Sequence, residues 1–173
     1  LTQRAGAFPA GFAALARFAE RFALPVVEFW PSRISLPVDH PMHAGFDPAA
    51  ALAQADLVLA LDALTPWIPL RHELPAGCRV IQLGPDPLFA ATPVRGFPCD
   101  LALAGDVAAS LDLLGEALER HPSVASSELD RRRAQLADRH ARARAERLAV
   151  ADVTPGTPMA PSYLSRQVAK ALP

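Results

Sequence analysis

The sequence predicts an α/β protein with a doubly wound, Rossmann-like parallel sheet, followed by a charged helix and a linker. Three short apolar runs carry this prediction, and they occupy residues 56–62, 78–83 and 100–104. The first run holds five consecutive apolar residues between Asp56 and Asp62, so both of its faces are expected to be buried, as in an interior strand of a parallel sheet. Runs that alternate with helical patterns at this spacing are typical of parallel strands joined by right-handed crossovers.

The first helix and strand precede these runs. Residues 9–22 are predicted to form a helix that has Pro9 in its first turn and one continuous apolar face. Residues 24–29 are rich in β-branched side chains and are expected to form a strand. Residues 30–46 contain three prolines, which indicates a long irregular segment of the kind that carries ligand-binding or interface loops. The apolar positions of the helix are Phe8, Phe12, Leu15, Ala19 and Phe22.

The later helices have recognisable starts. Asp47 followed by Pro48 predicts an N-cap and a short helix over residues 49–55. Asp106 is expected to cap a helix over residues 107–121, which Pro122 ends. Residues 62–75 and the turn at residues 84–87 are predicted to be irregular.

Residues 127–149 have a different character, with seven arginines, four acidic residues and only a thin apolar stripe. Two interpretations remain open: a basic surface for an acidic partner, or a solvated connector helix. Residues 153–161 are rich in proline and predict a linker. Residues 162–172 are then expected to start a new helix.

Composition excludes several classes of protein. A net charge of −1 over 173 residues argues against a nucleic-acid or membrane partner recognised by bulk electrostatics. Cys78 and Cys99 each precede an apolar run, which favours buried thiols in a reducing cytoplasm over a disulfide or a metal site. The sequence lacks a nucleotide-binding glycine motif, a phosphate loop, a serine-nucleophile elbow and a zinc-protease motif.

A few side chains remain as candidates for chemistry. His40 and His43 could share a metal, but Pro41 between them disfavours an ordered pair, and a hydrogen bond to loop backbone is the alternative. Asp62 and Asp86 follow two of the predicted strands. A carboxylate at that edge of a parallel sheet can accept a ribose hydroxyl, or it can simply bind loop amides.

Trp30 and Trp67 lie in proline-flanked loops. One interpretation is that they anchor a contact with another domain or subunit. The other is that each forms a local cap over the edge of the sheet.

The order of the elements resembles the central domain of thiamine-diphosphate-dependent enzymes of the acetolactate synthase and benzoylformate decarboxylase type. The resemblance covers roughly residues 5–121 and continues weakly over residues 158–164, and it rests on an ordered series rather than on one motif. The series is Pro25-Val-Val-Glu-Phe-Trp, Leu36-Pro-x-Asp-His-Pro-x-His-x-Gly-Phe, Ala55-Asp-Leu-Val-Leu-Ala-Leu-Asp, Arg79-Val-Ile-Gln-x-Gly-x-Asp-Pro and Asp100-Leu-Ala-Leu-Ala-Gly-Asp.

The resemblance implies a division of labour among three domains. Residues 1–121 correspond to the central domain, residues 122–152 to an Arg-rich connector helix, and residues 153–173 to a linker and the first helix leading to a pyrophosphate-binding domain. In that family the catalytic Glu lies in the preceding domain, and the motif that holds Mg²⁺ and thiamine diphosphate lies in the following one. No residue of this chain is therefore expected to be catalytic, cofactor-binding or metal-binding.

The same resemblance implies a scaffold and interface domain of a cytoplasmic homo-oligomer that acts on 2-oxo acids. Some members bind FAD in this domain, but Gly84 stands at one of the two positions that are often acidic in those members, leaving Asp86. Together with the missing first strand and its glycine-rich turn, this argues against FAD binding. That first strand would be central to the sheet, so the isolated chain is expected to be marginally stable or prone to aggregation. The alternative is an autonomous nucleotide-binding or regulatory module of similar fold, and the weakest option is an interaction protein built on the Arg-rich helix.

Overall fold

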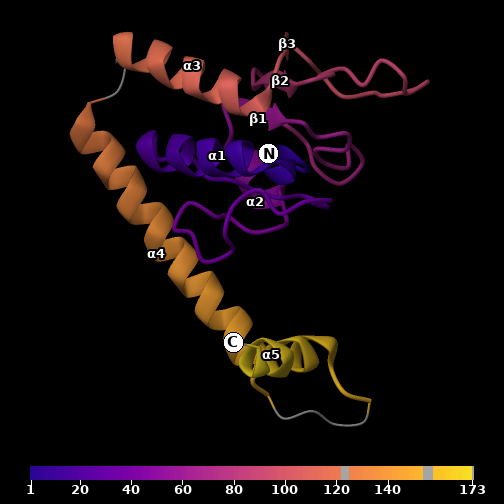
Figure 1. The fold of residues 1–173 in the computed structure, drawn as a ribbon, viewed down its shortest axis with the longest axis vertical. Coiled ribbons are helices and arrows are strands. Elements are labelled where there is room, and N and C mark those ends of the chain that lie inside the picture. Colours follow the sequence, from indigo (N-terminus) through magenta and orange to yellow (C-terminus); the bar gives the residue numbers. More distant parts are fainter. Residues whose placement is uncertain (122–124, 154–157, 173) are drawn as a thin grey trace.

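A parallel sheet of three strands lies in the upper right of Figure 1, close to the N-terminus. The structure is a computed structural model that describes residues 1–121, 125–153 and 158–172. The strands lie in the order β1 (Leu57–Leu61), β2 (Arg79–Gly84) and β3 (Leu101–Ala104), with both neighbouring pairs parallel. The three apolar runs therefore form the predicted strands, and the α/β class is confirmed.

Two long helices cover one face of this sheet. α1 (Pro9–Arg21) and α3 (Val107–Arg120) contact each other and lie side by side against the strands (Figure 1). Asp106 caps α3 as predicted, because its side chain accepts a 2.9 Å hydrogen bond from the Ala109 amide. The buried residues between the sheet and the two helices include Leu15, Phe18, Leu61, Leu83 and Leu111.

A smaller layer covers the opposite face. The helix α2 (Ala49–Leu52) contributes Leu52 to a cluster with Val58, Trp67 and Val80. Asp47 accepts a 2.9 Å hydrogen bond from the Ala49 amide at the predicted helix start, but the N-cap residue is Pro48 and not Asp47. α2 ends three residues before the expected boundary at residue 55, where the chain turns into β1. A single turn, η1 (Ala5–Ala7), precedes α1.

The predicted strand at residues 24–29 is reduced to an isolated parallel bridge between Val26 and His43. Its backbone is hydrogen bonded on one side, where the Val26 amide donates to Met42 and the Ala44 amide donates to Val26. On the other side its partner among the described residues is Thr2, whose amide donates to Val27. With one short partner there, the segment cannot form an extended ladder.

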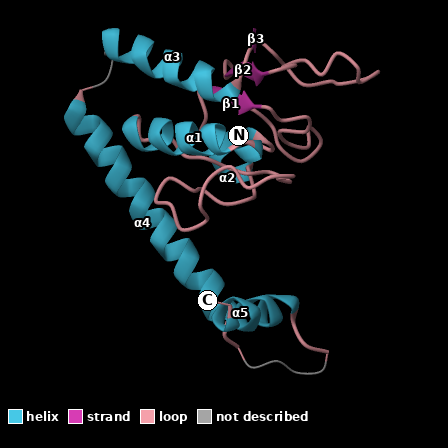
Figure 2. Ribbon diagram, in the orientation of Figure 1, coloured by secondary structure: helices cyan, strands magenta, loops and turns pink. Residues whose placement is uncertain are grey.

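The C-terminal part of the chain leaves the sheet. α4 (Ser126–Ala151) is a single long helix that runs past α1 and away from the strands, and α5 (Pro161–Ala171) packs against its far end (Figure 2). Of the expected linker at residues 153–161, residues 154–157 lie outside the described part of the chain. Among the described residues, none of the helices combines the length and apolarity needed to cross a bilayer.

Candidate functional site

Asp62 lies at the carboxyl end of β1, where a parallel sheet presents its ligand-binding edge. Its Oδ1 is 2.5 Å from Nη2 of Arg4, and its side chain is only 13% exposed. The Asp62 amide donates to the carbonyl of Leu83, and its φ of +42° lies in the left-handed region that Asp tolerates better than most residues. Asp62 is therefore held by Arg4 through Oδ1 and by β2 through its amide.

Asp86 follows β2 and is also engaged locally. Its Oδ2 accepts a 2.9 Å hydrogen bond from the Ala90 amide, which closes the turn after the strand. Phe89 in this turn has a φ of +51°, and its ring lies under two guanidinium groups. Arg4 is 5.2 Å and Arg95 is 4.9 Å from the ring centroid. No spacing rule in the sequence predicted this stacked arrangement, because Arg4 lies 85 residues before Phe89 and the loop after β2 has no regular pattern.

Arg95 ties the turn after β2 to the loop after β1. Its Nη2 donates to the Ala63 carbonyl at 2.9 Å, and its Nε donates to the Leu64 carbonyl at 3.1 Å. Partial burial lowers the pKa of Arg95, but the neighbouring thiol of Cys99 and the Asp86 carboxylate act in the opposite direction. An arginine in this setting remains charged and serves as a donor to backbone carbonyls.

Gln3 is a second residue that sequence reasoning missed. Its buried amide Nε2 donates to the Phe29 carbonyl at 3.1 Å and to the Thr65 carbonyl at 2.9 Å, while Oε1 accepts from the Thr65 amide at 3.1 Å. One side chain thus joins the N-terminal turn to two loops that are 26 and 62 residues away. A lone Gln in a loop carries no sequence pattern that could have predicted this.

Several polar side chains at the carboxyl edge of the sheet bind other groups of the protein. Asp62 is paired with Arg4, and Asp86 accepts from a backbone amide. Gln3 and Arg95 donate to backbone carbonyls. Within the described residues, no group of three or more His, Cys, Asp or Glu side chains is arranged to hold a metal ion. The hydrogen bonds of these side chains organise the loops at this edge.

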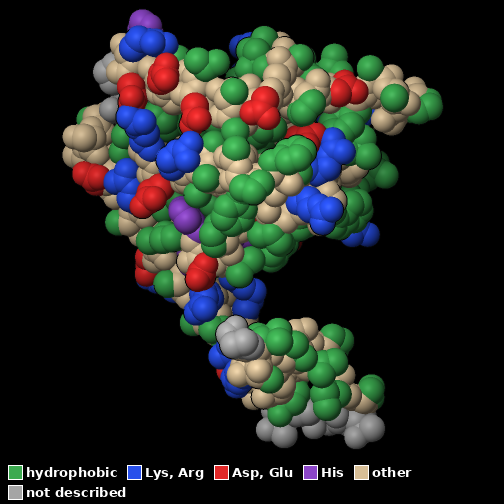
Figure 3. All heavy atoms as spheres, viewed as in Figure 1, with side chains coloured by type: hydrophobic (Ala, Val, Ile, Leu, Met, Phe, Trp, Pro, Cys, Tyr) green, Lys and Arg blue, Asp and Glu red, His purple; other side chains and the backbone are tan. Residues whose placement is uncertain are grey.

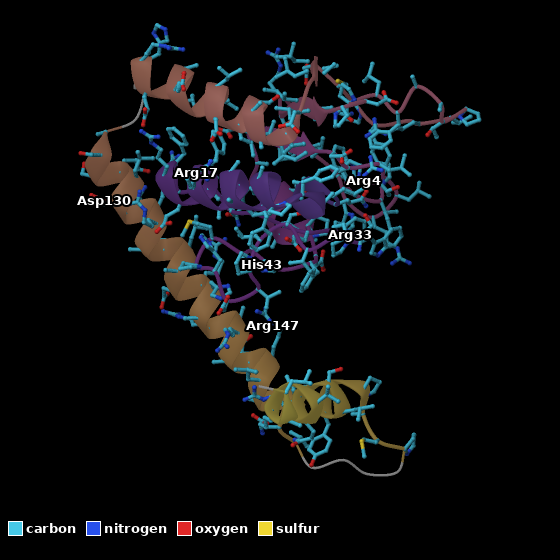
Figure 4. All side chains as sticks on the ribbon, viewed as in Figure 1. Arg4, Arg17, Arg33, His43, Asp130 and Arg147 are labelled. Carbon is cyan, nitrogen blue, oxygen red and sulfur yellow. The ribbon has the colours of Figure 1, made fainter. Side chains whose placement is uncertain are left out.

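His40 and His43 both bind loop backbone, which is the alternative that the sequence left open. Nδ1 of His40 accepts from the Met42 amide, and Nδ1 of His43 accepts from the Gly45 amide, each at 3.1 Å. Burial lowers the pKa of His43 to about 4, and the positive potential of His140 and Arg147 adds to this effect. Figure 4 shows His43 beside α4, on the side from which Arg147 projects.

Glu28 is fully buried next to this region. Its Oε1 accepts hydrogen bonds of 2.7 Å from the amides of Ser35 and Leu36, and burial raises the pKa of its carboxyl group. The two hydrogen bonds to Oε1 act against this rise in pKa, and Oε2 has no partner among the described residues. Glu28 therefore acts as an internal cap for residues 35–36.

A comparison with known families decides the identity of this fold. The family model for the thiamine pyrophosphate enzyme, central domain, matches residues 6–114, which is more than half of the chain. The chain belongs to this family. No curated protein matches it significantly. Membership implies a thiamine-pyrophosphate-dependent parent enzyme in which this central domain contacts other domains.

The donor set of this central domain does not fit the diphosphate and metal of that cofactor. Asp62, Asp86 and Asp106 follow the three strands, and each accepts a hydrogen bond from the protein. Arg4, which could meet an anion, is paired with Asp62. The described residues therefore provide no cluster of ligands for a metal ion at this edge.

The two tryptophans of the central domain have different environments. Trp67 is 2% exposed and packs edge-on against Phe97 in the cluster beneath the sheet. Trp30 is 62% exposed, has a φ of +47° and stacks on Phe29 with a centroid distance of 4.7 Å. Only Trp30 is therefore available for a contact with another surface.

The expectation that both cysteines are buried thiols is wrong. Cys78 is half-buried and Cys99 is exposed, and both are free. Cys99 precedes β3, whose residues are exposed along the whole strand, so the apolar run after it did not imply burial.

The Arg-rich helix α4 carries charges of both signs. Arg131 and Arg132 pair with Glu128, and Arg142 pairs with Asp138, so these cations meet acidic partners on their own helix. Basic and acidic side chains are interspersed over the faces of α3 and α4 that Figure 3 shows. This distribution favours the solvated connector helix over a basic docking surface.

Proposed function

We propose that this chain is the non-catalytic scaffold and interface domain of a thiamine-diphosphate- and Mg²⁺-dependent enzyme that acts on 2-oxo acids. The type of parent enzyme is proposed to be acetolactate synthase-like or decarboxylase-like, cytoplasmic and homo-oligomeric. The observation that carries the proposal is the family match over residues 6–114. It is supported by the carboxylates of Asp62 and Asp86, which bind Arg4 and a backbone amide of this domain.

The proposed division into residues 1–121, 122–152 and 153–173 follows the change in character along the chain. The sheet and its helices lie within the first range, and α4 is mostly polar with His140 as its buried residue. α5 has apolar side chains spaced by four residues, Leu164, Val168 and Leu172, which are all about half exposed or more. Hydrophobic side chains gather over α5 in Figure 3. Such a face suits a contact with a neighbouring domain.

The proposal is tested first by the coding sequence on both sides of this chain. It expects an upstream domain with a catalytic Glu and a downstream domain with the Gly-Asp-Gly…Asn motif that holds Mg²⁺ and diphosphate. Unrelated sequence on both sides would overturn it.

A second test uses the 173-residue chain in calorimetric titrations with thiamine diphosphate plus Mg²⁺, FAD, NAD and ADP. The scaffold proposal expects no binding heat with any of them. Micromolar binding of FAD, NAD or ADP would instead support the alternative, an autonomous nucleotide-binding or regulatory module. An Arg4→Gln variant serves as the matched control, because loss of the heat in that variant would place the nucleotide at the carboxyl edge.

A further inference from the structure

Two buried histidines lie together where α4 contacts the loop at residues 43–46. His140 on α4 is 8% exposed and His43 is 2% exposed, and their ring centroids are 6.3 Å apart. The ring of Phe46 lies against His43 at a centroid distance of 5.1 Å. Nε2 of each histidine is buried and has no hydrogen-bond partner among the described residues. The two rings are therefore shielded from water at the surface that joins α4 to the domain.

The hydrogen bond of the His43 ring fixes the position of its proton. Nδ1 accepts from the Gly45 amide at 3.1 Å, so the neutral ring carries its proton on Nε2. A second proton would have to enter at Nδ1, where it would face the Gly45 N–H. Two donors would then oppose each other, and the turn at Gly45, whose φ is +94°, would lose this bond. A protonated His43 is therefore incompatible with the present conformation of the loop.

The same loop is the attachment point for the second half of α4. The His43 carbonyl accepts a 2.8 Å hydrogen bond from Nδ1 of His140. The first half of α4 is held separately, by Arg133, which donates to two carbonyls at the end of α1, and by Leu136, which packs against the core. A movement of the His43 peptide therefore weakens the attachment of the half that begins at His140 and carries α5.

The charged and titratable side chains around His43 oppose a second positive charge there. His140 and Arg147 act from α4, and His40 acts from the same loop. Arg147 projects from α4 on the side of His43 (Figure 4). On the adjoining segment, the carboxyl group of Glu28 already accepts from two backbone amides. Among the described residues, none of the side chains that act electrostatically on His43 is acidic, so a proton on His43 is not compensated.

We propose that His43 and His140 form a proton-operated latch between the domain and α4. While His43 is neutral, the second half of α4, residues 140–151, is held against the loop at residues 43–46. When His43 takes up a proton, this half is released and the sheet stays folded. The first half remains attached through Arg133 and Leu136, so the release is confined to the end of α4 that carries α5. The latch rests on this contact alone and does not depend on the proposed function.

The pH dependence of the release follows from the two states of His43. In the held state, burial and the neighbouring charges lower the pKa of His43 to about 4, whereas an exposed histidine titrates near pH 6.5. The released state therefore binds the proton more readily, and the ratio of released to held molecules rises about tenfold per pH unit below about pH 6.5. The rise ends near pH 4, where the held state also takes up the proton, after at most about 300-fold.

The test is amide hydrogen exchange of the 173-residue chain between pH 7.5 and 4.5, read by mass spectrometry and corrected for the intrinsic pH dependence of exchange. A short polar helix without a tertiary contact is only marginally stable in water, so the amides of residues 140–151 exchange once this half is released. We expect their protection to fall at least about tenfold over this pH range. Protection of residues 127–136, β1 and β2 should change less than about twofold.

A first pair of variants identifies the group that takes up the proton. His43→Asn keeps an acceptor for the Gly45 amide but does not titrate, so the protection of residues 140–151 should become independent of pH. His121→Asn is the control, because His121 is exposed after α3, and it should retain the fall seen in the unmodified chain.

A second pair uses two exposed arginines of α4, whose replacement leaves the buried contact intact. Arg147→Gln removes a charge that acts on His43, so the fall in protection between pH 7.5 and 4.5 should be at least about twofold smaller. Arg139→Gln removes an arginine of the same helix that does not act on His43, and it should leave the fall unchanged.

Four outcomes would overturn the proposal. Unchanged protection of residues 140–151 in the unmodified chain would show that acid does not release α4. An equal loss of protection in β1 and β2 would show that acid unfolds the whole domain instead. A fall that persists in His43→Asn would assign the proton to another group. Equal behaviour of Arg147→Gln and Arg139→Gln would show that the charge beside His43 plays no part in the release.

Discussion

His140 on α4 donates through Nδ1 to the carbonyl oxygen of His43, and this 2.8 Å hydrogen bond joins residues that are 97 positions apart. The carbonyl can only accept, so the proton lies on Nδ1 of His140. His140 is the buried residue of α4, and the His43 ring lies 6.3 Å from the His140 ring. Nearer the start of α4, Arg133 donates to the Glu20 and Arg21 carbonyls at the end of α1. The connector helix is thus attached to the domain by these polar contacts and by Leu136, which packs against the core.

Replacing His140 with Ala is expected to loosen α4. The change leaves the buried His43 carbonyl without its donor, which costs about 1–3 kcal/mol. Limited trypsin digestion should therefore cut within α4 at least several-fold faster than in the unmodified protein. His121→Ala is the control, because His121 is exposed after α3. Equal digestion rates for both variants would contradict the proposed attachment.

The free energy of unfolding of the chain should fall in acid because His43 becomes protonated. Burial holds the pKa of His43 at about 4, below its value of about 6.5 in the unfolded chain, so the unfolded state binds the proton more readily. The contribution of neutral His43 is therefore complete above pH 6.5 and is lost as the pH falls toward 4. The loss is at most about 3 kcal/mol. Urea unfolding measured by circular dichroism between pH 4 and 7.5 gives the slope of the free energy of unfolding against pH.

His43→Asn is the matched variant for this pH dependence, because the Asn Oδ1 can still accept from the Gly45 amide but does not titrate. His140, His40 and Arg147 are the other charged or titratable groups that act on His43, and they are unchanged in the variant. We expect a shallower pH slope between 4 and 6.5. Identical slopes for the two proteins would place the titration elsewhere.

The local signals in the sequence predicted the elements well. Asp106 and Pro9 marked the starts of α3 and α1, because caps and N-terminal prolines act within one turn. The apolar run before Asp62 predicted a strand, and β1 forms there, but the expected interior position is wrong: β1 lies at the edge of the described sheet, and Leu57 is exposed.

Long-range contacts could not be predicted in the same way. Gln3 reaches Thr65, and Arg95 reaches Ala63, across distances in sequence that no spacing rule covers. Residues 24–29 were predicted to form a full strand because their side chains favour one. Among the described residues, however, their backbone has only Thr2 as a partner on one side, so no extended ladder forms. The predicted burial of Cys99 was wrong for a related reason, because β3 lies at the edge of the sheet with its side chains exposed.

Asp62 is expected to behave as a loop organiser rather than a catalyst. Asp62→Asn removes the charge opposite Arg4 but tolerates the φ of +42°, so it should cost no more than about 1 kcal/mol. Asp62→Ala also loses the pair and adds about 1–2 kcal/mol for the left-handed backbone. Urea unfolding should show that the Asp62→Asn variant is more stable than the Asp62→Ala variant. In the full-length parent enzyme, the Asn variant should retain kcat, and a large loss of kcat with unchanged stability would instead make Asp62 catalytic.

Two glycines in helices are expected to respond in opposite ways to the same substitution. Gly115→Ala lies within α3, where the added Cβ would be 3.6 Å from Cε2 of Phe22, an ordinary packing distance. The gain in helix propensity should stabilise the protein by about 0.5–1 kcal/mol. Gly11→Ala lies within α1, where the Cβ would be 2.2 Å from the carbonyl oxygen of Ala5.

Because that oxygen belongs to the backbone, the turn η1 has to move when Gly11 becomes Ala, and we expect a net loss of about 1–3 kcal/mol. The propensity term is the same at both sites, so the difference between the two variants measures the close approach of η1 to α1. Thermal unfolding midpoints of the two variants and the unmodified chain are sufficient to measure it. A Gly11→Ala midpoint equal to that of Gly115→Ala would mean that η1 does not lie against α1.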